Sequence, residues 1–139
     1  MAKKKEIMII DDDPDVLMSV KQLLEACGFK VYSFNNGRDC LKLLDNGIKP
    51  SLIILDIMMP EMSGWEIQRR LEENPNWDNI PVVFLTGRNS DIAKDMCKKY
   101  GMGYVKKPFD IESLKQNINK VLKSKKAKNL QREKYNYCS

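Results

Sequence analysis

The 139-residue chain contains no histidine. This absence excludes metal sites of the HExxH type and nucleophile systems in which histidine activates serine or cysteine. It also means that the chain supplies no phosphohistidine of its own. Any chemistry on this chain must therefore use carboxylates, lysine, threonine, tyrosine, or a metal ion held by oxygen atoms.

Paired cysteines and long apolar runs are also missing. Cys27, Cys40, Cys97 and Cys138 lie far apart and none forms a CxxC pair, so we expect reduced and mostly buried thiols. No run approaches the roughly 20 apolar residues of a membrane span. The basic and then apolar start, residues 1–10, lacks the length and the cleavage site of a signal peptide. We therefore expect a cytoplasmic protein without membrane contact.

The net charge of +5 is unevenly distributed. Acidic residues cluster at Asp11–Asp15, whereas basic residues cluster at Lys3–Lys5 and between Lys120 and Lys134. A basic tail is able to contact nucleic acid, but we favour a solvated chain end, and nucleic acid is not an expected partner. The length suits one domain, which we place at residues 1–123, with a basic tail or linker at 124–139.

Apolar segments alternate with segments of helical spacing along the chain. Asp13-Pro14 is typical of an N-cap and a first helical residue. Strands that alternate with helices predict a parallel sheet covered on both faces, and right-handed crossovers make it doubly wound. We thus predict an α/β fold with five helices, at residues 14–27, 38–45, 65–73, 90–100 and from 111 onward, and five strands, at residues 6–10, 29–34, 51–56, 80–85 and 104–106.

Reactive side chains follow the predicted strands. Asp11 and Asp12 come after the first strand, Asp56 ends the third, Thr86 follows the fourth and Lys107 follows the fifth. Functional sites of such sheets lie at the carboxyl ends of the strands. We therefore expect these five side chains to meet.

The residue types at these strand ends suit phosphoryl transfer. Clustered carboxylates repel one another unless a cation joins them, and Mg²⁺ prefers oxygen ligands. One carboxylate then remains free as a nucleophile. An ammonium group offsets charge on the transferring oxygens, and a threonine hydroxyl donates to a phosphoryl oxygen.

Two other classes compete with this interpretation. A small phosphatase of the haloacid-dehalogenase type would use Asp11 as nucleophile and Asp13 as acid and base, but Pro14-Asp15 departs from that pattern. A DNA-binding module would instead use the basic tail. The first class predicts loss of phosphoryl labelling only with Asp11→Asn, and the second predicts duplex binding that weakens steeply with salt.

Four stretches, IIDDDPD, LIILDIMMPEMSGWEI, VVFLTG and YVKKPF, resemble the receiver domain of response regulators in two-component systems. The resemblance covers residues 6–123. It implies a flavodoxin-like sheet with strand order 2-1-3-4-5, and a signalling switch rather than an enzyme.

The resemblance also implies a role for each site residue. Asp56 is the implied phosphoacceptor. Thr86 binds the phosphoryl group, and Lys107, not Lys106, is the functional lysine. The implied cofactor is Mg²⁺, bound by Asp12 directly, by Asp11 through water, by Asp56 and by the backbone carbonyl of Met58.

A switch and its partners follow from the same resemblance. Tyr104 is the implied aromatic switch partner of Thr86, and Gly87 and Arg88 flank the phosphoryl group. The phosphodonor is a sensor histidine kinase. Output uses the face at residues 90–123, through an unidentified downstream protein or through homodimerisation on phosphorylation. We expect a stand-alone regulator, and the alternative is a receiver cut from a longer DNA-binding transcriptional regulator.

Overall fold

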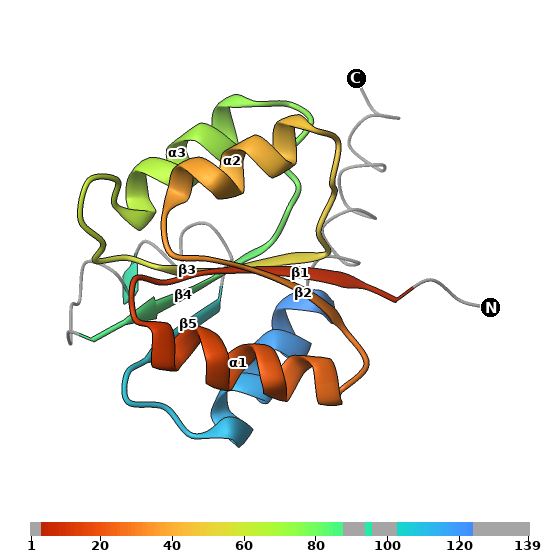
Figure 1. Ribbon diagram of the computed structural model, residues 1–139, viewed down its shortest axis with the longest axis vertical. Coiled ribbons are helices and arrows are strands. Elements are labelled where there is room, and N and C mark those ends of the chain that lie inside the picture. Colours follow the sequence, from red (N-terminus) through yellow and green to blue (C-terminus); the bar gives the residue numbers. More distant parts are fainter. Residues whose placement is uncertain (1–3, 88–93, 96–102, 124–139) are drawn as a thin grey trace.

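Five parallel strands form one sheet in the computed structural model, which describes residues 4–87, 94–95 and 103–123 (Figure 1). The sheet order is β2-β1-β3-β4-β5. This confirms the predicted doubly wound parallel sheet and its order. The strands are β1 (Glu6–Ile10), β2 (Lys30–Phe34), β3 (Leu52–Asp56), β4 (Val82–Thr86) and β5 (Gly103–Lys106).

Helices cover both faces of the sheet. Figure 1 shows α2 (Gly37–Asp45) and α3 (Gly64–Glu73) on one face, with α1 (Pro14–Ala26) and a helix at residues 111–123 on the other. The structure thus describes four of the five predicted helices. The fifth, predicted at 90–100, falls mostly outside the described residues. No helix in the described ranges is both long and apolar enough to cross a membrane.

Side-chain caps set where these helices begin. The Asp13 carboxylate accepts from the backbone N–H of Asp15 at 2.9 Å, as the sequence predicts. Asn36 and Ser63 cap α2 and α3 in the same way. The fourth strand starts at Val82 rather than at the predicted Ile80, because Pro81 has no N–H to donate to a neighbouring strand.

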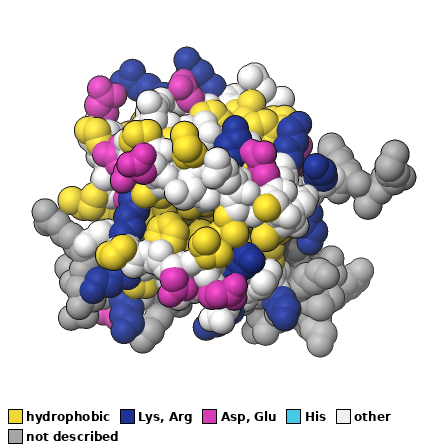
Figure 2. Space-filling model, turned by 60° about the horizontal axis from the view of Figure 1, so that its bottom comes forward, with side chains coloured by type: hydrophobic (Ala, Val, Ile, Leu, Met, Phe, Trp, Pro, Cys, Tyr) yellow, Lys and Arg dark blue, Asp and Glu magenta, His cyan; other side chains and the backbone are white. Residues whose placement is uncertain are grey.

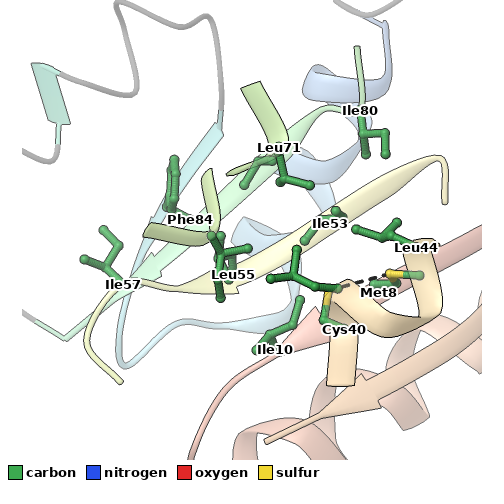
Figure 3. Packing of buried hydrophobic residues seen from close by; sticks show 13 residues of the cluster. Met8, Ile10, Cys40, Leu44, Ile53, Leu55, Ile57, Leu71, Ile80 and Phe84 are labelled. Carbon is green, nitrogen blue, oxygen red and sulfur yellow. Dashed lines mark hydrogen bonds between the residues drawn. The ribbon is translucent and has the colours of Figure 1, made fainter. Parts of the chain in front are cut away.

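The core has two layers, one on each face of the sheet. Side chains alternate along β3, so that Ile53 and Leu55 pack toward α2 and α3 while Leu52 and Ile54 pack toward α1. Figure 3 shows the first layer, in which Phe84 of β4 lies close to Leu55. All five residues of β3 are buried, which explains its unbroken apolar sequence.

The expectation of mostly buried cysteines fails at Cys27. Cys27 is exposed, because it is the C-cap residue where the chain leaves α1 and turns toward β2. Ile111, the first residue of the last helix, is 56% exposed, and burial in this helix begins at Leu114. Cys40 is buried as predicted, while Cys97 and Cys138 lie outside the described residues.

Figure 2 turns the α1 side forward and shows apolar side chains near its centre with charged side chains around them.

Candidate functional site

The carboxyl edge of the sheet gathers the predicted strand-end residues. Asp11 follows β1, Asp56 ends β3 and Thr86 ends β4. Asp11 has no exposed surface, and Asp56 and Thr86 are 3% and 2% exposed. The parallel strands all point to this edge, so residues far apart in the sequence become neighbours.

Among the residues that the structure describes, Lys107 supplies the positive charge at this site. Its Nζ lies 2.6 Å from Oδ2 of Asp11 and 3.6 Å from Oδ2 of Asp56. Its backbone N–H donates to the carbonyl of Thr86 at 2.7 Å, which fixes the chain after β5 against the end of β4. Lys106, the last residue of β5, is exposed. The structure therefore brings Lys107, and not Lys106, to the carboxylates.

Three carboxylates converge beside Lys107. Asp11, Asp12 and Asp56 each offer an oxygen, and these oxygens all lie within 4.8 Å of one another. A hard divalent cation takes such oxygen ligands, and Mg²⁺ typically keeps several waters as well. The group fits Mg²⁺, because Asp12 is exposed and leaves room for those waters. The site opens to solvent through a cavity of about 540 Å³, lined by Asp12, Asp13, Asp56, Met58, Gly87 and Lys107.

Burial shifts the protonation of the site. Burial raises the pKa of Asp56 to about 7, and the nearby charge of Asp11 adds to the rise. Lys107 and the Met58 N–H, which donates to Oδ1 of Asp56 at 3.3 Å, oppose this shift. Burial lowers the pKa of Lys107, but its contacts with Asp11 and Asp56 outweigh this and raise the pKa above its ordinary value. A cation at the carboxylates would keep Asp56 ionised at neutral pH.

Gly64 is a site residue that the sequence reasoning did not single out. A Cβ on Gly64 would lie 2.4 Å from the carbonyl oxygen of Asp56 and 2.9 Å from Cα of Ile57. Only glycine allows the start of α3 to approach the end of β3 this closely. The available signal was a glycine at the first helical position, directly after the Ser63 cap.

The remaining predicted residues have varied positions. Tyr104 is half-buried and packs on the same core layer as Phe84. Gly87 lines the opening, and a Cβ added to it would meet open space. Met58 is 54% exposed beside Asp56. Asp13 caps α1, a structural role that differs from the acid and base of a phosphatase. Arg88 lies outside the described residues.

Known proteins share this arrangement. The family model "Response regulator receiver domain" matches residues 7–119. Protein PilH of Pseudomonas aeruginosa is 33% identical over 117 residues, which cover 84% of this chain and 96% of PilH. The crystal structure of the chemotaxis protein CheY4 of Vibrio cholerae superposes with a TM-score of 0.78 at 26% identity, over 86% of this chain and 99% of CheY4.

Other relatives are longer than this chain. A probable cyclic di-GMP phosphodiesterase of Vibrio cholerae is 34% identical over 125 residues, which cover 89% of this chain and 28% of that protein. The chain likewise spans only about half of two other curated regulators that it matches (53% and 55%). The family model and the near full-length match to PilH establish the family. This chain belongs to the response regulator receiver domains of two-component signal transduction systems.

Proposed function

We propose that this chain accepts a phosphoryl group on Asp56 from a sensor histidine kinase, and that Mg²⁺ is required. Receiver domains as a family are signalling switches that accept phosphate from histidine kinases. The observation that supports the proposal for Asp56 is its position at the end of β3, 3.6 Å from Lys107 and beside two further carboxylates. A cytoplasmic location follows from the proposed donor.

Transfer to Asp56 is a single displacement at phosphorus. A carboxylate oxygen of Asp56 attacks the phosphorus of the kinase phosphohistidine, an O–P bond forms, and the N–P bond breaks. The imidazole leaves and takes a proton from water. Lys107 offsets the charge on the transferring oxygens, and the hydroxyl of Thr86 donates to one of them.

The acidic residues and Met58 would hold the metal ion. In this proposal Asp12, Asp56 and the carbonyl of Met58 bind Mg²⁺ directly and Asp11 binds it through water. The ion would supply positive charge that keeps Asp56 ionised and neutralises phosphoryl oxygens. Asp11 also contacts Lys107 at 2.6 Å, so it orients the ammonium group as well.

Phosphorylation is proposed to shift a two-state equilibrium. Thr86 moves toward the phosphoryl group, and Tyr104 turns inward into the space that this movement opens. Partner binding or dimerisation would use the face at residues 90–123, within a switch domain at residues 1–123 that carries a basic tail or linker at 124–139. Gly87 leaves room beside the phosphoryl group, and Arg88 is proposed to flank it.

Labelling with a small phosphodonor tests the proposal. Acetyl phosphate and Mg²⁺ should add one phosphoryl group by intact mass, and Asp56→Asn should abolish it. Asp13→Asn is the matched control, since asparagine caps a helix as well as aspartate does, and it should keep the label. Loss of label with Asp11→Asn or Asp13→Asn but not with Asp56→Asn would support the phosphatase instead.

A further inference from the structure

The first turn of α3 rests directly on the backbone of the proposed phosphoacceptor. The N–H of Gly64 donates to the carbonyl of Ile57 at 3.0 Å. A Cβ at Gly64 would lie 2.4 Å from the carbonyl oxygen of Asp56, so no side chain separates the helix from the strand end. A shift of the Asp56–Ile57 backbone must therefore move the start of α3.

Trp65, the next residue, makes a second connection. Its ring centroid lies 4.9 Å from that of Phe84, with an interplanar angle of 47°. Tilted aromatic pairs at this distance are favourable beyond the area that they bury. Phe84 is fully buried in the middle of β4 (Figure 3). Trp65 thus joins α3 to the strand that ends in Thr86.

Phe84 is also a neighbour of both proposed switch residues. Thr86 is two positions further along β4, so its side chain points to the same face of the sheet. Tyr104 is paired with Phe84 across the β4–β5 register and packs on the same core layer. Any rearrangement of Thr86 and Tyr104 therefore changes the surroundings of the Phe84 ring.

We infer that Trp65 is a positioning residue that couples the first turn of α3 to the phosphorylation state of Asp56, an inference that rests on the proposed function. The path runs from Thr86 and Tyr104 to Phe84, and from Phe84 to Trp65. The contact between Gly64 and the Asp56 carbonyl supplies a second path to the same turn. By this inference α3 responds to phosphorylation in addition to the face at residues 90–123.

Trp77 provides a matched control within the chain, which has two tryptophans. It packs partly buried against the same core layer as Trp65. It lies in the loop before β4, however, and its backbone N–H donates to the carbonyl of Asn74 at 2.9 Å. This places it at the edge of the sheet opposite Asp56, so it reports general loosening of the layer but not the coupling.

Two single-tryptophan variants test the inference. Trp77→Phe leaves only Trp65, and Trp65→Phe leaves only Trp77. Tryptophan emission is recorded before and after acetyl phosphate and Mg²⁺, and intact mass is measured on the same samples. Labelling should change the emission of Trp65 and leave that of Trp77 unchanged, and adding Asp56→Asn should remove both the label and the change.

The mass measurement separates the two possible failures. A labelled protein whose Trp65 emission stays constant, or whose two tryptophans change equally, overturns the inference alone. An Asp56 that takes no label overturns the proposed function and the inference with it. Phe84→Leu in the Trp77→Phe background should keep the label and reduce the emission change, because only the contact at Gly64 then remains. If the change is undiminished there, the path through Phe84 is wrong.

Discussion

The Asp56 carboxyl titrates near neutral pH in the folded protein. Burial is the largest cause of this shift, which raises the pKa from 3.8 to about 7. The folded protein therefore binds more protons than the unfolded chain between about pH 4 and 7, and its stability should fall as the pH rises through this window. The loss is on the order of 2–4 kcal/mol. Urea unfolding in the presence of EDTA at a series of pH values measures it.

The matched variant for this effect is Asp56→Asn, which cannot ionise. The unfolding free energy of this variant should depend much less on pH between 4 and 7 than that of the wild type. At pH 7 the variant should be more stable than the wild type. Saturating Mg²⁺ should flatten the wild-type curve in the same way. A wild-type stability that rises with pH in this window would show that burial does not govern Asp56.

Lys107 and Lys106 are adjacent lysines with different surroundings. Lys107 contacts two buried carboxylates, whereas Lys106 is exposed. Lys107→Ala should slow labelling of Asp56 by about 10- to 100-fold, because one stabilising cation is lost from the transferring group. Lys106→Ala should leave the rate unchanged. Time courses of intact mass compare the two, and equal slowing would contradict the role of Lys107.

At the scale of elements, the start of α3 constrains the end of β3. Alanine at an exposed helical position is ordinarily about 1 kcal/mol better than glycine. At Gly64 the added Cβ would lie 2.4 Å from the carbonyl oxygen of Asp56. Gly64→Ala should therefore destabilise the protein by about 1–3 kcal/mol, as measured by urea unfolding.

Gly87→Ala is the control for Gly64→Ala. Apart from Gly87 itself and its two neighbours in the chain, nothing described lies within 4 Å of a Cβ built at Gly87, so we expect little change in unfolding free energy. If Gly64→Ala instead stabilises the protein, the strand and helix must separate more easily than their contact suggests. That result would also weaken the case for coupling between Asp56 and α3.

At the scale of the whole molecule, metal binding should be linked to folding. Asp11, Asp12 and Asp56 come from two separate strand ends, so the site exists only in the folded chain. Mg²⁺ at 100 times its dissociation constant should stabilise the fold by about 2.7 kcal/mol. Thermal unfolding with increasing Mg²⁺ measures this gain.

Asp12→Asn should lose most of the Mg²⁺-dependent gain. Asp15→Asn removes the same charge in the first turn of α1 but lies outside the carboxylate group, so it should keep the gain. A similar loss in both variants would indicate that general electrostatics, and not coordination by Asp12, explains the effect.

The sequence by itself determined the elements and the kinds of side chain at the strand ends. Unbroken apolar runs predicted the buried strands, and Asp13 predicted the start of α1, because these signals depend on residues close together in the chain. The resemblance to receiver domains indicated Lys107 rather than Lys106.

Only the tertiary structure decided how these side chains interact. The distances from Lys107 to Asp11 and Asp56, and the raised pKa of Asp56, depend on burial and on neighbours far away in the sequence. The exposure of Ile111 and the close approach at Gly64 likewise depend on where each helix meets the sheet. Local sequence patterns carry no information on these contacts, because the segments that pack together lie far apart in the sequence.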